Sequence, residues 1–105
     1  MAVGGKGGTR IITCVAQTIL NYFEYGMPLL DSVAKPRFHH QWIPDELQFD
    51  APGPSADVQA SLTKMGYKLN VSPGKVFCHV VAVAREKNLL HGASDPREVG
   101  LAGGY

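Results

Sequence analysis

A nearly continuous apolar run over residues 76–84 is the feature that most constrains how this chain can fold. The run is rich in β-branched valine, which predicts a strand covered on both of its faces. The polar triplet at residues 86–88 predicts a turn, and residues 89–93 can return beside the first strand as its antiparallel neighbour. We therefore expect a sheet that has residues 76–84 as its central strand.

The first third of the chain predicts two helices. Residues 9–25 carry apolar side chains at helical spacing and are followed by Gly26, a C-terminal stop signal. Residues 28–34 predict a shorter helix that ends near Lys35, because Pro36 disfavours helix in the residue before it. The residues that follow show no sustained period, and we expect an ordered loop that leads into a short strand at residues 46–50.

The middle of the chain predicts one more helix and one more strand. Residues 51–54 break the chain, and Ser55 after them is a good N-cap for a helix with Val58, Leu62 and Met65 on one face. Residues 67–71 alternate between apolar and polar, as in a half-buried strand. The whole order predicts an α+β fold with a mainly antiparallel sheet, in a single domain over residues 1–105.

Composition excludes several classes of partner. The chain has 105 residues, of which 45% are hydrophobic and 18% charged, so it belongs to the globular class. Its formal net charge of +1 leaves no basic surplus for phosphate backbones, so we expect no nucleic-acid partner. We also expect no contact with a membrane, because no apolar run approaches the length of a membrane span.

The two cysteines, Cys14 and Cys78, each lie inside an apolar run far from the other. A buried thiol in such a run behaves as a small hydrophobic side chain. We favour two buried thiols over a disulfide, although the sequence leaves both interpretations open.

Most polar residues give no catalytic or metal-binding pattern. The histidines show no zinc-ligand spacing, so we expect no metal site and no cofactor; they are His39, His40, His79 and His91. The neighbours Asp45 and Glu46 are better interpreted as a solvated turn than as a general acid and base. Neither Cys14 nor Ser94 has the sequence surroundings of a nucleophile.

The glycine-rich stretch at residues 4–8 has two interpretations. Glycines before a helix let the backbone approach an anion, so Gly7 and Gly8 with Thr9 could form an oxyanion hole. The stretch fits neither the P-loop nor the dinucleotide fingerprint. On these residues alone a flexible chain terminus is the favoured interpretation.

Three longer segments, taken together, resemble a known family. GGKGGTRIIT, EYGMPLLDSVAKPRFHHQWIPDEL and the final HGASDPREVGLAGGY are similar to the carboxy-terminal part of the small subunit of γ-glutamyltranspeptidases, also called glutathione hydrolases. The resemblance implies part of an N-terminal-nucleophile hydrolase fold, which has layers in the order αββα when complete. Residues 1–105 are then a partial domain.

The resemblance also assigns a role to the glycines. In the family, the backbone N–H groups at the positions of Gly7 and Gly8 stabilise the oxyanion of the tetrahedral intermediate. The family usually has a Ser-Pro pair where this chain has Gly5 and Lys6, a difference that we expect to loosen the turn and to place a cation near the site. The nucleophilic threonine and the residues that hold the α-amino and α-carboxylate groups of the substrate would lie upstream of Met1.

The implied reaction is transfer of the γ-glutamyl group of glutathione to an acceptor or to water, through an acyl-enzyme. The alternative is a non-catalytic, truncated paralogue that acts as an interaction or folding module. In either case we expect the isolated polypeptide to be inactive and to associate with a missing upstream or large-subunit segment, or with itself. Family members are often periplasmic, secreted or surface-anchored, and no signal for a compartment is recognised in these residues.

Overall fold

The structure is a computed structural model that describes residues 1–72 and 77–104. It divides into two compact units, one formed by Met1–Lys35 with Cys78–Tyr105 and the other by Pro36–Phe77. That residues 1–105 make up one partial domain stays a prediction. Among the described residues, no helix has both the length and the apolar character needed to cross a membrane.

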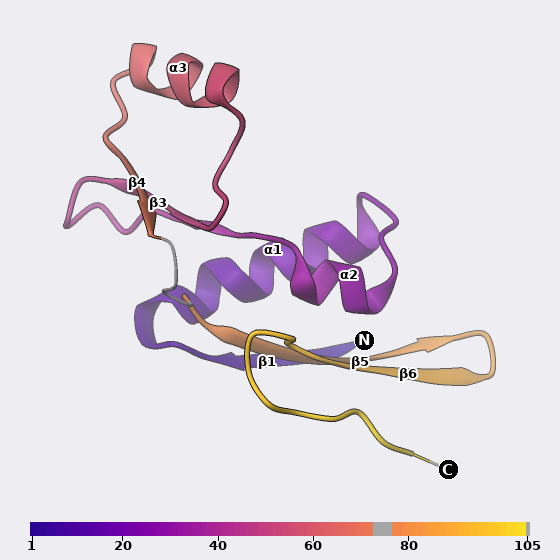
Figure 1. Cartoon of the computed structure of the whole chain (residues 1–105). Coiled ribbons are helices and arrows are strands. Elements are labelled where there is room, and N and C mark those ends of the chain that lie inside the picture. The colour runs from indigo at the N-terminus through magenta and orange to yellow at the C-terminus, as the bar shows by residue number, and fades with distance from the viewer. Residues whose placement is uncertain (73–76, 105) are drawn as a thin grey trace. The chain divides into compact units, whose positions relative to one another are not determined.

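The first unit is built on a sheet of three antiparallel strands (Figure 1). Strands β1 (Ala2–Lys6), β5 (His79–Glu86) and β6 (Leu89–Ser94) lie in the order β1-β5-β6. The predicted central strand and its hairpin partner are thus confirmed, with Glu86 paired to Leu89 across the turn. The first residue of the predicted strand, Val76, lies outside the described residues.

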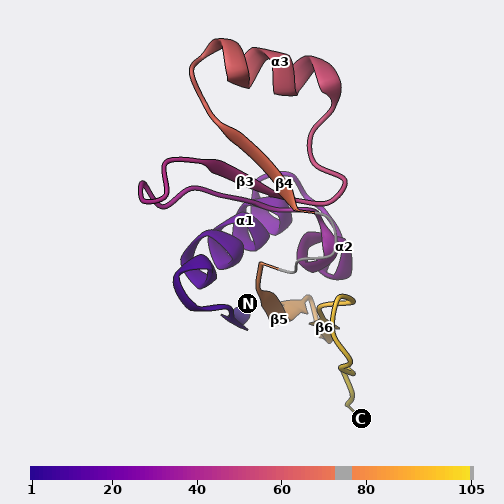
Figure 2. The same cartoon turned by 60° about the vertical axis from the view of Figure 1, so that its left-hand side comes forward.

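Two helices cover one face of this sheet, and the segment after β6 runs along the other face (Figures 1 and 2). The predicted first helix begins as a 3-10 turn, η1 (Gly8–Arg10), and continues as α1 (Ile11–Phe23). The second predicted helix is α2 (Leu29–Ala34), and its last residue is followed by Lys35 in an extended conformation, as Pro36 requires.

Strand β5 is packed on one face and about half exposed on the other, so the prediction of burial on both faces is wrong. Val80, Ala82 and Ala84 are at most 3% exposed, whereas Val81 and Val83 are 54% and 48% exposed. Side chains alternate between the faces of a strand, and only the face toward α1 and α2 is packed. Small alanines on that face let the helices approach closely. The apolar sequence of β5 therefore includes a second face whose valines stay about half exposed in this chain.

The apolar residues that predicted α1 are also not the ones that pack. The buried residues of α1 are Cys14 and Thr18, one turn apart. Ile12 and Phe23, in contrast, are 77% and 65% exposed, and Leu20 is 51% exposed. These three residues form an outward apolar stripe, since their spacing brings them to one side of a helix.

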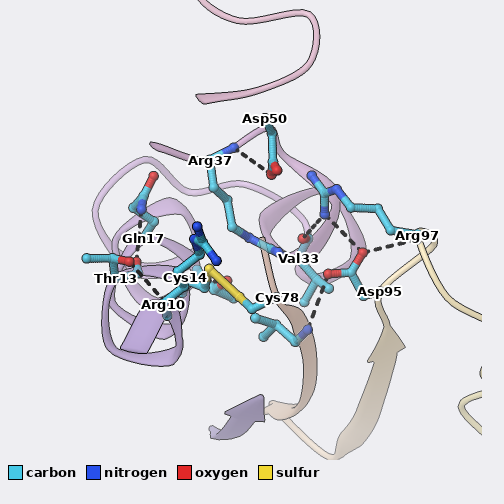
Figure 3. The surroundings of a disulfide bond; sticks show 12 residues. Arg10, Thr13, Cys14, Gln17, Val33, Arg37, Asp50, Cys78, Asp95 and Arg97 are labelled. Atoms are coloured by element: carbon cyan, nitrogen blue, oxygen red, sulfur yellow. Dashed lines mark hydrogen bonds and ion pairs between the residues drawn. A yellow bond between two sulfur atoms is a disulfide. The ribbon is translucent and has the colours of Figure 1, made fainter. Parts of the chain in front are cut away.

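Cys14 and Cys78 form a disulfide between α1 and the residue before β5 (Figure 3). Both are buried as expected, but the favoured interpretation as free thiols is wrong. The packing of α1 against the start of β5 brings the two Cα atoms to 6.8 Å, within the range that a disulfide spans. Sequence separation, which is 64 residues, could not reveal this approach.

Asp95 and Arg97 connect the end of the hairpin to the end of α2 (Figure 3). Asp95 Oδ2 accepts a hydrogen bond from the N–H of Val80 at 3.2 Å, and Asp95 Oδ1 accepts one from Arg97 Nη1 at 2.9 Å. The guanidinium also donates to the carbonyl oxygens of Ala34 at 2.7 Å and Lys35 at 2.9 Å. These carbonyls lie at the end of α2, where the carbonyl groups of a helix have no N–H partner within the helix. Arg97 therefore acts as the C-terminal cap of α2.

The second unit contains a strand-helix-strand crossover. Strands β2 (Phe38–His39), β3 (Leu47–Asp50) and β4 (Leu69–Ser72) lie in the order β2-β3-β4, and helix α3 (Ala56–Lys64) joins the two parallel strands β3 and β4. The predicted strand and helix are confirmed, while β2 was expected to be loop. The remaining pairings of the described strands are antiparallel, so the sheets are mainly antiparallel as predicted.

Helix α3 starts after Ser55 and stops before Gly66, whose φ is +98°, as its sequence signals predicted. Its predicted apolar face is not buried, since no residue of α3 is buried and Met65 after it is 74% exposed. Asp50 accepts the N–H of Arg37 through Oδ2 at 3.2 Å, which fixes the start of this unit to the end of β3.

We predict that removal of the disulfide destabilises the fold. Replacing Cys14 and Cys78 together by alanine frees a loop closed across 64 residues, for which chain entropy predicts a loss of about 4 kcal/mol. Urea unfolding followed by circular dichroism measures this loss. Reduction of the unmodified chain with dithiothreitol should shift its midpoint in the same direction, and an unchanged midpoint in both cases would contradict the prediction.

We also predict that Arg97→Lys lowers the free energy of unfolding by about 1.5 to 3 kcal/mol, the range for hydrogen bonds made by charged groups. Lysine keeps the charge but has one nitrogen, so it cannot donate to Asp95 as Nη1 does and to the carbonyls of Ala34 and Lys35 as Nη2 does at the same time. Arg85→Lys is the matched control, because Arg85 is exposed and donates only to the carbonyl of Lys87. Equal effects of the two substitutions in urea unfolding would show that Arg97 is not a cap.

Candidate functional site

The two glycines singled out by the sequence form the turn between β1 and the first helix. Gly7 has φ 149° and ψ 20°, and Gly8 has φ 63° and opens η1. Both lie in the region of positive φ that favours glycine. A Cβ atom placed on Gly8 would meet nothing within 4 Å, so Gly8 is needed there for its backbone angle rather than for lack of space.

The carbonyl groups of this turn fix the direction of the neighbouring N–H groups. Arg10 N–H donates to the carbonyl of Gly7 at 3.4 Å, and Ile11 N–H donates to the carbonyl of Gly8. In a trans peptide the N–H points opposite to the C=O of the preceding residue. Because both carbonyls point into the helix, the N–H groups of Gly8 and Thr9 point out of its N-terminal end. This end carries the positive partial charge of the helix.

The cation expected near the turn is paired. Lys6 Nζ lies 2.5 Å from Glu98 Oε1, and His79 Nδ1 lies 3.1 Å from Glu98 Oε2. Lys6 and His79 are partners in the β1-β5 register, so their side chains share one face of the sheet. The sequence analysis missed Glu98 as a member of this cluster, because it lies 92 residues from Lys6 and no local pattern connects them.

The other histidines each have a separate polar partner. His39 Nε2 lies 2.9 Å from Gln41 Oε1, and His40 Nε2 lies 3.2 Å from Asp45 Oδ1. His91 Nε2 lies 3.8 Å from the carboxylate of Glu86. Within the described part of the chain, no group of three potential metal ligands comes together.

The acidic pair is divided between two structural contacts. Asp45 faces His40, whereas Glu46 accepts the side-chain amides of Gln48 at 2.5 Å and Asn70 at 3.1 Å. Glu46 thus joins the start of β3 to β4, and the two carboxylates do not act on a common point. Cys14, considered above as a nucleophile, is held in the disulfide.

Comparison with known proteins identifies the wider context of this turn. The family model for γ-glutamyltranspeptidase matches residues 1–105. Glutathione hydrolase proenzyme 1 of Schizosaccharomyces pombe is 38% identical over 100% of this chain and 17% of its own length. The glutathione hydrolase proenzyme of Escherichia coli is 39% identical over 100% of this chain and 18% of its own length.

Solved structures of γ-glutamyltranspeptidases also match this chain. The γ-glutamyltranspeptidase of Pseudomonas nitroreducens, in complex with L-DON, matches 98% of this chain and 54% of its own chain with a TM-score of 0.87 and 34% identity. This chain therefore spans less than a fifth of the curated relatives named above. The fold is that of the N-terminal-nucleophile hydrolases to which these neighbours belong. The chain belongs to the γ-glutamyltranspeptidase family.

Proposed function

We propose that this chain forms part of a γ-glutamyltransferase or glutathione hydrolase in which Gly7 and Gly8 stabilise the oxyanion. The observation that carries the proposal is the outward direction of the Gly8 N–H at the start of a helix. Family membership supplies the reaction, which acts on γ-glutamyl compounds such as glutathione.

The proposed role follows from where charge develops. A nucleophilic threonine, located in the family upstream of the residues matched here, attacks the γ-carbonyl carbon of the donor, and the carbonyl oxygen takes up the electron pair. The N–H groups of the glycine turn donate to this oxygen, and the partial positive charge of the helix end adds to the stabilisation. The free α-amino group of the threonine takes up the hydroxyl proton during the attack and passes it to the leaving nitrogen, so collapse of the intermediate expels the donor amine and leaves an acyl-enzyme. Water or an acceptor amine then attacks the acyl group.

A chimaera tests this role. We would replace the region of the Escherichia coli proenzyme that aligns with this chain, over 106 aligned positions, by residues 1–105. The chimaera should release product from a γ-glutamyl anilide, whereas the 105-residue polypeptide alone should not. Gly8→Pro removes the N–H and should lower kcat of the chimaera about a hundred- to a thousand-fold, as loss of one oxyanion donor does elsewhere.

Gly26→Pro is the matched control for the chimaera. Gly26 has φ +64° against +63° for Gly8, and a Cβ on either would meet nothing within 4 Å. Both substitutions therefore force the same backbone change, but Gly26 follows the far end of α1. If the two variants lose activity equally while remaining folded by circular dichroism, the N–H of Gly8 is not an oxyanion donor.

We further propose that the rest of the enzyme covers the two apolar surfaces that this chain leaves open. These are the outward stripe on α1 with Ile12 and Phe23, and the outer face of β5 with Val81 and Val83. An exposed apolar face of this kind on packed elements is typical of a surface that is buried in the complete protein. In the layered fold of the family, a second sheet would lie against the face of β5.

Val83→Glu should have different effects in the free 105-residue chain and in the chimaera. In the 105-residue chain the side chain is 48% exposed, so stability should change by less than about 0.5 kcal/mol in urea unfolding. In the chimaera a buried, unpaired carboxylate should reduce the yield of soluble protein severely. Val99→Glu is the control, since Val99 is fully exposed. Equal yields of the two chimaera variants would contradict the proposed cover, and dimers of the free chain that Val83→Glu dissociates would indicate self-association.

A further inference from the structure

The carboxylate of Glu98 holds two neighbouring strands at the point where the glycine turn begins. One oxygen lies 2.5 Å from Lys6 Nζ and the other lies 3.1 Å from His79 Nδ1, so each oxygen has its own partner. Lys6 is the last residue of β1 and is followed directly by Gly7. The cluster of Lys6, His79 and Glu98 therefore acts at the base of the turn.

The side of the cluster that carries Glu98 is anchored. Glu98 N–H donates to the carbonyl of Asp95 at 3.2 Å, which closes a turn directly after the buried Asp95 carboxylate. Asp95 is fixed by the N–H of Val80 and by Arg97, and Arg97 is in turn fixed to the end of α2. These hydrogen bonds thus hold in place the backbone that carries Glu98.

The segment beyond Glu98 also stays close to β6. A Cβ added to Gly92 would come within 2.8 Å of the Cβ of Ala102, and one added to Gly100 would overlap the Oγ of Ser94. Glycine at these two positions permits the close approach. The segment beyond Glu98 therefore stays against β6 on the face of the sheet that α1 and α2 leave open (Figure 1).

The glycine turn, in contrast, has no side chain at Gly7 or Gly8 through which it could be held. A Cβ placed on Gly8 would meet nothing within 4 Å, and the carbonyl groups of Gly7 and Gly8 accept the N–H groups of Arg10 and Ile11. Glycine also has the largest backbone freedom of any residue. An ion pair that fixes Lys6, the residue before the turn, therefore limits the backbone conformations that the turn can adopt.

We propose that Glu98 is a positioning residue that confines the Gly7-Gly8 turn by fixing Lys6. The proposal rests on the proposed oxyanion role of these glycines. It also accounts for the lysine where the family usually has a Ser-Pro pair: Glu98 restores through an ion pair the restraint that a proline would give through its ring. Because the charges of Lys6 and Glu98 cancel, the ion pair adds no net charge at the turn.

Amide hydrogen exchange in the 105-residue chain tests, without any assay of activity, whether the Lys6–Glu98 ion pair confines the turn. Glu98→Gln and Lys6→Gln should each raise the exchange rates of the Arg10 and Ile11 amides about two- to five-fold, the range expected for a partly exposed ion pair. The double variant should exceed neither single variant, since each already breaks the same pair. Lys6→Arg keeps the pair and should restore slow exchange.

Glu24→Gln is the matched control, because Glu24 is an exposed glutamate of the same unit that follows α1. It should leave both exchange rates unchanged. If Glu98→Gln has no more effect than Glu24→Gln, or if the two single variants add, the proposal is overturned.

The chimaera adds the catalytic readout. There, Glu98→Gln should lower kcat about two- to five-fold with KM unchanged, because confinement of the turn matters for the transition state rather than for substrate binding. A change in KM alone would overturn the positioning role. Retained activity in Gly8→Pro would instead refute the proposed function, and the exchange rates would still decide whether Glu98 holds the turn.

Discussion

The buried carboxylate of Asp95 is the contact on which the first unit depends. Its side chain is 1% exposed, and a buried charge is costly unless it is both paired and hydrogen-bonded. Asp95 meets both conditions, with the N–H of Val80 on one oxygen and Arg97 on the other. The same contact joins three elements, because Val80 belongs to β5, Asp95 follows β6, and Arg97 closes α2. Loss of the Arg97 guanidinium would remove the cation that pairs with this buried carboxylate.

What the sequence could predict was local. Helix α2 ends beside a proline and α3 lies between a serine and a glycine, so the signals for their bounds are adjacent to the elements themselves. The hairpin of β5 and β6 is also local, since its turn is short. The errors about packing concern which face of an element is covered. An apolar residue such as Ile12 or Val81 indicates that a surface is buried somewhere, but the partner that buries it need not be in the residues at hand.

The features of the candidate site also divide into those that local sequence signals reveal and those that only the tertiary fold brings together. Gly7 and Gly8 were recognisable because glycines before a strongly periodic segment indicate a turn into a helix, and the family resemblance gave that turn a role. Their positive φ angles agree with the choice of glycine. The Cys14–Cys78 disulfide and the pairing of Lys6 with Glu98 were not recognisable, because both link residues that only the tertiary fold brings together. Their chemistry was visible in the sequence, but their partners were not.

The arrangement of the sheet explains why the turn and the C-terminal segment meet. One face of the β1-β5-β6 sheet is closed by α1 and α2, so only the other face is open to the segment that follows Arg97 (Figure 2). Residues of β1 and β5 that point to this open face include Lys6 and His79, which are register partners. A carboxylate on the segment therefore reaches the last residue before the glycine turn without crossing the helices. In this fold, confinement of a glycine turn can come from Glu98, far along the chain, because the anchored Asp95 and Arg97 fix the position of the backbone that carries it.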